Sequence, residues 1–305
     1  MARRLIIGYE ESEQGEDALM LGQVLGEVLG AELLVVSVVV YPLGRGSVEA
    51  GLAVSGHSDQ LREKVRDKIA GPVEARALGS NSAAGALNDV IDHEDPIAIV
   101  LGSGHHGPVG RVLVGSVGTA LLSGARCPIA VAPRGYSKRS EHRLQQIGVA
   151  FNGSEESKAG LAAAVSLAGR VHGSLTVLGS NEPLAPGYGT LIPLISEAEF
   201  EQSGQEVMAR ILDEAVQAAP SRLAIETRVL DGEAAGAIAS AAEHLSLDLL
   251  VIGSRAYGPI RRVLLGGVAS RLLRIAPCPV LVLPRGAGFD PLGFGAKHVS
   301  TSDGS

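Results

Sequence analysis

Residues 253–285 read GSRAYGPIRRVLLGGVASRLLRIAPCPVLVLPR, and this stretch decides how the rest of the chain is interpreted. An apolar run of strand length, residues 248–252, precedes its glycines, and a segment with helical periodicity follows them. A strand, a glycine-containing turn and a helix in succession are typical of the crossover in an open α/β sheet. Glycines at such a turn let backbone N–H groups approach an anion, and the next helix adds unpaired donors at its N-terminus. The stretch therefore predicts an α/β fold with a phosphate-sized site at the crossover.

The same stretch occurs earlier in the chain. Residues 102–134 read GSGHHGPVGRVLVGSVGTALLSGARCPIAVAPR, and positions 102, 115, 127 and 134 recur at 253, 266, 278 and 285, a constant offset of 151. A shared offset over such a length indicates a tandem repeat of one domain. Near the start of each copy, Ser12 corresponds to Ser154 at an offset of 142, so the second copy carries nine extra residues before its third helix.

Each copy follows the order β-α-β-α-β-α-β-α-β. The expected fold is two tandem doubly wound domains, each a five-stranded parallel sheet flanked by helices. A loop is expected after the second strand of each copy, at residues 41–56 and 179–193. The predicted division of the chain is domain 1 at 1–134, a linker at 135–144, domain 2 at 145–285 and a disordered tail at 286–305.

Composition excludes several functional classes. The chain has 305 residues and a net charge of −7, and aromatic residues make up only 3% of it. Nucleic-acid binding needs a basic face and stacking side chains, so no nucleic-acid partner is expected. No apolar run approaches bilayer length, and the basic start leads directly into a short strand, so we expect no membrane association and a cytoplasmic location.

A few residues outside the crossovers have simple structural interpretations. Ser12 and Ser154 each precede a helix, where serine commonly accepts hydrogen bonds from the first amides. Cys127 and Cys278 occupy equivalent positions before a final strand and are expected to be small buried side chains, with a disulfide or a metal role as the alternative. The pair His105 and His106 could suggest a metal, but no carboxylate or cysteine follows at ligand spacing.

The crossovers, the Cys-Pro strands and the repeat together resemble the universal stress protein family in its tandem form. The family pattern is Gly, two residues, Gly, nine residues, Gly and then Ser or Thr, with a first strand that ends in Asp. The resemblance implies an adenine-nucleotide alpha-hydrolase-like fold and a stress-response regulatory protein. It also implies ATP, with Mg²⁺ as a possible counter-ion, or AMP at the carboxyl ends of the strands. Domains of this family pair through the last strand, which allows pairing of the halves within one chain as well as a homodimer.

The resemblance assigns nucleotide contacts to positions in both halves. They are Glu10, Val38, Gly102, His105, Gly115, Ser116 and Val117 in the first half, and Asn152, Gly179, Gly253, Ala256, Gly266, Gly267 and Val268 in the second. Five of these depart from the family pattern: His105 and Ala256 replace its second Gly, Gly267 its Ser or Thr, and Glu10 and Asn152 its Asp. The base is expected near the ends of the first two strands, and the phosphates on the backbone of residues 115–117 and 266–268.

The second half is the favoured site. Arg255, Arg261 and Arg262 near its crossover can neutralise phosphates, whereas the first half offers mainly Arg111 and titratable histidines. Ordinary solvated surface is the alternative for these arginines. No positioned general base is evident, so any ATP hydrolysis is expected to be slow. The departures motivate an alternative function, a dimerisation or scaffold module that binds no nucleotide. An enzyme acting on small molecules is a third class, which the fold alone does not support.

Overall fold

The computed structural model describes residues 3–41, 47–69, 71–104, 109–124, 126–181, 197–217, 223–254 and 266–284. The elements of the first half are β1 (Arg4–Gly8), α1 (Glu13–Leu29), β2 (Glu32–Val40), α2 (Ser47–Lys68), β3 (Val73–Ser80), α3 (Ala83–Glu94), β4 (Ala98–Gly102), α4 (Ser116–Leu122) and β5 (Ile129–Ala132). A 3-10 helix, η1 (Tyr136–Lys138), follows. The elements of the second half are β6 (Gln146–Ala150), α5 (Glu155–Val171), β7 (Ser174–Asn181), α6 (Glu197–Gln217), β8 (Ala224–Asp231), α7 (Ala234–His244), β9 (Leu249–Gly253), α8 (Gly267–Ile275) and β10 (Val280–Leu283).

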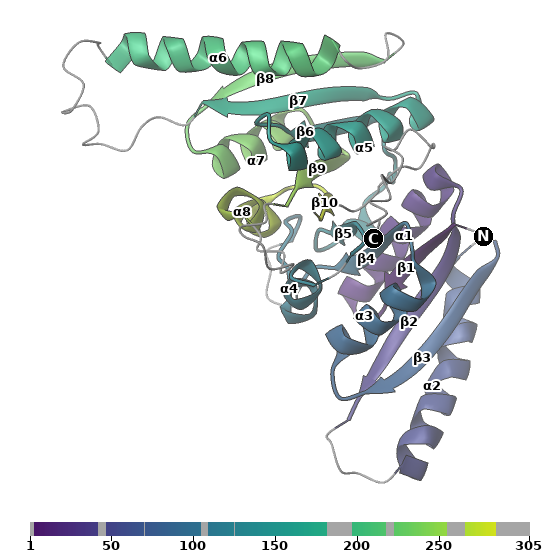
Figure 1. Ribbon diagram of the computed structural model, residues 1–305. Coiled ribbons are helices and arrows are strands. Elements are labelled where there is room, and N and C mark those ends of the chain that lie inside the picture. Colours follow the sequence, from purple (N-terminus) through teal and green to yellow (C-terminus); the bar gives the residue numbers. More distant parts are fainter. Residues whose placement is uncertain are drawn as a thin grey trace, which may run out of the picture.

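The ten strands form one sheet in the order β3-β2-β1-β4-β5-β10-β9-β6-β7-β8. Within each half all neighbouring strands are parallel, and β5 pairs with β10 antiparallel at the middle of the sheet. Figure 1 shows the two halves meeting at this pair, with α2 and α6 at the far ends. The predicted fold class is confirmed, and the pairing through the last strands that the resemblance implied is found within the chain.

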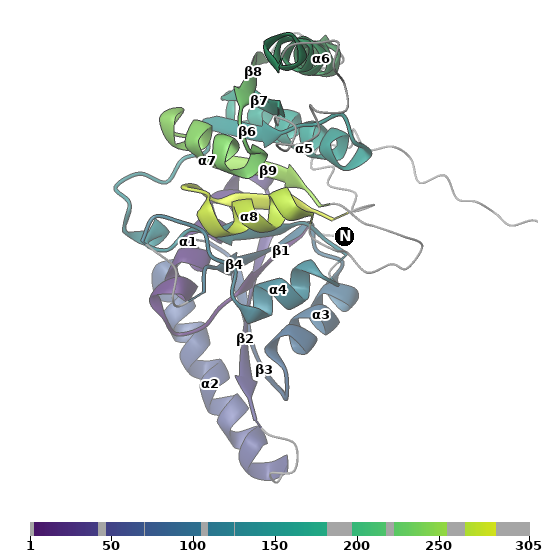
Figure 2. The same ribbon diagram turned by 90° about the vertical axis from the view of Figure 1, so that its left-hand side faces the viewer.

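Helices cover both faces of the sheet, and in the first half Figure 2 shows α1 and α2 on one side of β1 and β2, and α3 and α4 on the other. Side chains of successive strand residues point to opposite faces, so Leu5 and Ile7 of β1 belong to one buried cluster and Ile6 to the other. The first cluster includes side chains from α1, α2, α5 and α6, and the second includes side chains from α3, α4, α7 and α8. The runs of Val, Leu and Ile in the sequence therefore form a sheet that is buried on both faces.

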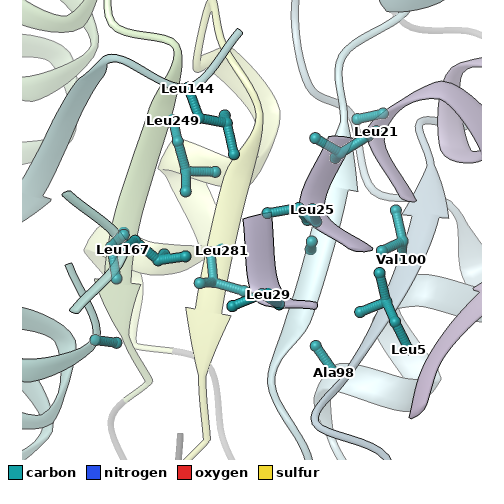
Figure 3. Close-up of a cluster of buried hydrophobic side chains, with 14 of the residues drawn as sticks. Leu5, Leu21, Leu25, Leu29, Ala98, Val100, Leu144, Leu167, Leu249 and Leu281 are labelled. Atoms are coloured by element: carbon teal, nitrogen blue, oxygen red, sulfur yellow. The ribbon is translucent and has the colours of Figure 1, made fainter. Parts of the chain in front are cut away.

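The junction between the halves is part of the core. Figure 3 shows Leu25 and Leu29 of α1 near Leu281 of β10 and Leu167 of α5, and all four belong to the first buried cluster. The guanidinium of Arg170 in α5 donates to the carbonyl oxygen of Val28 in α1 over 3.1 Å. One hydrophobic core therefore crosses the boundary between the repeats.

The segment predicted as a linker packs against α1. The carboxylate of Asp17, which is fully buried, accepts hydrogen bonds from the backbone N–H groups of Gly135 and Ser137 and from the Ser137 hydroxyl, each over 2.7 Å. Tyr136 and Leu144 are buried as well. These contacts fix the path of the chain between the two halves.

The predicted helix caps are confirmed. The Oγ of Ser12 accepts from the N–H of Gly15 over 3.2 Å, and the Oγ of Ser154 accepts from the N–H of Ser157 over 3.3 Å. Cys127 and Cys278 are buried free thiols, and burial raises the pKa of each to about 12. None of the helices in the described ranges has the length and apolarity that a bilayer crossing requires.

Both predicted loops are partly wrong. α2 already begins at Ser47, because packing overrides the low helix propensity of its glycines: Val54 lies beside the backbone of Gly79 in β3. In the second half β7 continues through Asn181, since it stays paired with β8 as far as the Asn181 and Asp231 positions. The remaining loop residues, 42–46 and 182–193, and the predicted tail lie outside the described residues.

Candidate functional site

A cavity of about 370 Å³ lies in the second half, where the strand order reverses between β6 and β9. Such a switch point, at the carboxyl ends of parallel strands, is where open α/β sheets bind ligands. The ends of both strands and the first turns of α5, α7 and α8 line it. The lining residues are Ala150, Phe151, Asn152, Ser154, Glu156, Ser157, Ser180, Ala234, Ile238, Ile252, Gly253, Gly266, Gly267, Val268, Ala269 and Leu272.

The three helices that begin at the cavity differ in how their first amides are satisfied. The Ser154 side chain caps α5, and the Glu233 carboxylate caps α7 by accepting from the N–H groups of Ala235 and Gly236. α8 begins after Gly266, which has no side chain to cap it. The first helical hydrogen bond of α8 runs from Ser270 N–H to the Gly266 carbonyl, so the amides of residues 267–269 precede that bond. The start of α8 therefore offers backbone donors to the cavity.

Space is available at the start of α8. Among the residues that the structure describes, a β-carbon built on Gly267 would meet no atom within 4 Å beyond its chain neighbours and its own helix backbone, so the position is open toward them. The predicted phosphate-binding backbone of the second half, Gly266, Gly267 and Val268, thus lines a real cavity at a helix N-terminus. A helix N-terminus with unpaired donors attracts negative charge.

Polar side chains also line the cavity at the ends of β6 and β7. Asn152 follows β6, and its Oδ1 accepts from the N–H of Ser154 over 3.1 Å, which shapes the turn into α5. Ser180 is near the end of β7 and lines the cavity. Both residues can hydrogen-bond hydroxyl groups of a ligand.

The structure corrects the assignment of Gly179. Phe151 N–H donates to Leu178 just as Tyr9 N–H donates to Val36, so the counterpart of Val38 is Ser180 and not Gly179. A β-carbon on Gly179 would instead collide with the Met208 side chain of α6, on the other face of the sheet. The offset of 142, applied consistently, would have identified Ser180.

Two carboxylates contribute to the electrostatics of the site. Glu156 of α5 lines the cavity. Glu233 caps α7, and its carboxylate forms an ion pair with Arg271 of α8 at 3.1 Å. The hydrogen bond from the Gly236 N–H, together with that from Ala235 and the nearby arginine, lowers the pKa of Glu233. The charge of Glu233 is therefore used to hold the starts of α7 and α8 together.

Gly102 and Gly253, the first glycines of the two crossovers, have a packing role. A β-carbon on Gly102 would lie 2.1 Å from the carbonyl oxygen of Gln14, and one on Gly253 would lie 2.5 Å from that of Glu156. Each glycine thus lets the end of a strand approach the first turn of a helix on the other side of the crevice. Gly253 also lines the cavity.

In the first half, hydrogen bonds join residues that follow β4 to residues just before α4 and to the end of β5. The hydroxyl of Ser103 donates to the Ala132 carbonyl over 2.7 Å and accepts from the N–H of Leu113 over 3.2 Å. Gly104 donates its N–H to the Leu113 carbonyl, and a β-carbon on Gly104 would lie 3.2 Å from the Cα of Gly115. The two sides of this crossover are in direct contact.

The remaining first-half positions are placed around that crossover. Ser116 and Val117 form the first turn of α4, Glu10 is an exposed residue after β1, and Val38 is partly exposed near the end of β2. The prediction that Arg111 neutralises a phosphate is not supported, because its guanidinium donates to the Ile275 carbonyl and to Glu243 of the second half. These contacts of Arg111 depend on how the two halves pack together, and no local sequence pattern predicts them.

Several predicted residues cannot be placed. His105, Ala256 and the arginines at 255, 261 and 262 lie outside the described residues. Across the ranges that are described, no group of three or more His, Cys, Asp or Glu side chains is arranged to hold a metal ion.

The fold and the cavity define a class of protein: a tandem α/β protein with a continuous ten-stranded sheet and an open, uncapped helix N-terminus at a topological switch point. The model of the universal stress protein family matches residues 1–133 and again residues 143–284. The chain belongs to the universal stress protein family.

Curated relatives agree with this assignment, one of them along most of the chain. A universal stress protein of Mycobacterium tuberculosis is 25% identical over 292 residues, which cover 92% of this chain and 99% of the relative. A shorter one from Bacillus subtilis is 30% identical over 141 residues and covers 44% of this chain and 95% of its own. The crystal structure of a universal stress protein from Archaeoglobus fulgidus shares the fold with a TM-score of 0.67 at 18% identity, covering 94% of this chain and all of the other.

Proposed function

We propose that this universal stress protein is a regulatory protein that binds an adenine nucleotide, ATP or AMP, in the cavity of its second half. The observation that carries the proposal is the start of α8, which no side chain caps and whose first residues line a cavity. Phosphate groups would accept hydrogen bonds from the backbone of residues 267–269. These amides form a concentrated set of donors where the helix dipole also favours negative charge.

The remaining walls suit the other parts of a nucleotide. The volume of about 370 Å³ falls within the range of about 300–1,000 Å³ that is common for ligand pockets. Ile238, Ile252 and Leu272 supply an apolar surface, while Asn152 and Ser180 supply hydrogen-bonding groups at the strand ends for a ribose or a base. Mg²⁺ would accompany ATP as a counter-ion of the phosphates.

Calorimetric titration of the full chain, stripped of small molecules, tests the proposal. ATP and AMP, each with and without Mg²⁺, are the titrants. The decisive variant is Gly267→Leu, because a large side chain at this cavity-lining position would take up space that the ligand needs, while its β-carbon meets no atom of the described residues outside its own helix within 4 Å. We expect this variant to weaken nucleotide binding by more than about tenfold.

Gly169→Leu is the matched control. Gly169 is an exposed glycine of α5 and is not among the cavity residues, and a β-carbon on it would meet no atom of the described ranges within 4 Å beyond its own helix. Binding to this variant should equal binding to the unaltered chain. If millimolar ATP and AMP give neither heat nor a shift in melting temperature, the nucleotide proposal is wrong. The alternative, a scaffold module without nucleotide, would then be favoured.

A further inference from the structure

α8 contacts the first half of the molecule at its C-terminal end. A helix leaves its last carbonyl groups without partners inside the helix. In α8 the Leu273 carbonyl accepts from the N–H of Val114, over 3.2 Å, and the Ile275 carbonyl accepts from the guanidinium of Arg111, over 3.1 Å. Both donors come from the crossover of the first half. The C-terminal cap of α8 is therefore supplied by the other repeat.

The chain just after α8 is held in the same way. The Ala276 carbonyl accepts from the N–H of Val112 over 2.9 Å, and the Pro277 carbonyl accepts from Arg139 of the linker over 2.9 Å. Val112 is fully buried and belongs to the same cluster as Leu272. The contact thus combines backbone hydrogen bonds with a buried side chain.

Arg111 joins two helices in this contact. Its Nη1 donates to Ile275 of α8, and its Nη2 lies 2.8 Å from the carboxylate of Glu243 near the end of α7. A cation at a helix C-terminus also complements the helix dipole. α7 and α8 are the helices whose opposite ends line the cavity, and Figure 1 shows α8 beside the junction of the halves.

We propose that Arg111 is a positioning residue for the anion-binding end of α8. α8 has nine residues and, at 1.5 Å per residue, a length of about 13 Å, so a shift or loosening at its last turn moves its first amides. A residue in the crossover of the first half thus positions the helix that begins at the site of the second half. This inference rests on the proposed function only for the nature of the ligand.

Hydrogen exchange on the ligand-free full chain tests whether Arg111 holds α8 in place. We compare the unaltered chain with Arg111→Gln and with the control Arg126→Gln. Arg126 is also a first-half cation, and its side chain is 81% exposed and 3.9 Å from Asp92. Peptides that cover residues 267–275 should exchange at least about fivefold faster in Arg111→Gln and unchanged in Arg126→Gln. Equal exchange in all three proteins would overturn the inference.

Binding of ATP and of adenosine tests the positioning role. Misplaced amides weaken phosphate contacts, so Arg111→Gln should raise the Kd for ATP by about five- to tenfold and leave the Kd for adenosine unchanged. Equal weakening of both ligands would indicate general destabilisation and would overturn the inference. If the unaltered chain binds no ATP, the proposed function fails, and the exchange experiment still decides whether Arg111 holds α8.

Discussion

Gly253 at the end of β9 lies so close to the carbonyl oxygen of Glu156 that a β-carbon on the glycine would be 2.5 Å from that oxygen. The corresponding distance in the first half, from Gly102 to the Gln14 carbonyl, is 2.1 Å. In both cases the neighbour is backbone, which cannot rotate away. The first glycine of each crossover is thus required by packing between a strand and a helix, whether or not that half binds a ligand.

We therefore expect Gly102→Ala and Gly253→Ala each to lower the free energy of unfolding by about 1–3 kcal/mol, the usual cost of overpacking. Chemical denaturation of the full chain measures this. Gly169→Ala is the control, because Gly169 lies in a helix and a β-carbon there meets no other described part of the chain within 4 Å, so alanine should stabilise by about 0.5–1 kcal/mol. Unchanged stability of both crossover variants would contradict the packing explanation.

The buried carboxylate of Asp17 holds the linker against α1. Its two oxygens accept three hydrogen bonds from Gly135 and Ser137, and an asparagine amide can accept at only one of its two ends. Asp17→Asn should lower the free energy of unfolding by about 1–3 kcal/mol, since a buried N–H loses its acceptor. Ser137→Ala, which removes only the hydroxyl, should cost about 1 kcal/mol. Denaturant titration ranks the two variants, and the reverse order would show that the linker is not held by this carboxylate.

Glu233 makes the stability of the α7 start depend on pH. Hydrogen bonds from Gly236 and Ala235, with Arg271 nearby, lower its pKa from the ordinary value of 4.5. A lowered pKa in the folded state means that the stabilisation is present above the unfolded pKa and is lost as pH falls through the folded one. At neutral pH, Glu233→Gln should therefore be less stable than the unaltered chain by about 0.5–1 kcal/mol, a small effect because solvent screens a carboxylate that is 39% exposed, and the difference should shrink below pH 4.5.

Unfolding curves at neutral and acidic pH measure this difference. Glu214→Gln, at an exposed glutamate near the C-terminal end of α6, removes the same charge without removing a helix cap. This control should show a smaller difference at neutral pH. A difference for Glu233→Gln that does not change with pH would refute the role of its charge.

The architecture was predictable because the signals that specify it are local and repeated. The apolar runs before and after each glycine crossover set the strands, and the predicted bounds of β10, Val280 to Leu283, agree with the structure. The same holds for the serine caps of α1 and α5. The constant offset of the repeat then required both halves to share one topology.

The predictions from the sequence were wrong where contacts between residues far apart in the chain determine the structure. Glycines in α2 suggested a loop, but contact between Val54 and β3 stabilises the helix there. Arg111 looked like a phosphate ligand from its position beside a glycine turn, although its partners are on the other repeat, more than a hundred residues away. For the site, the sequence identified the backbone at Gly266 to Val268, and it missed Ser180 and the α7 residues that complete the cavity.

Gly267 occupies the position where the family pattern has serine or threonine. A β-carbon at this position would meet no atom of the described residues within 4 Å outside its own helix, and Gly267 lines the cavity, so Gly267→Ser is expected to place a hydroxyl donor there. If the start of α8 binds phosphate, one added hydrogen bond to a charged group should tighten ATP binding by about tenfold, which corresponds to about 1.4 kcal/mol. Adenosine, which has no phosphate, should bind as it does to the unaltered chain. Calorimetric titration of both ligands against Gly267→Ser, with Gly169→Ser as the control, measures the effect. An equal gain for adenosine, or no gain for ATP, would mean that the phosphate does not lie at this helix start.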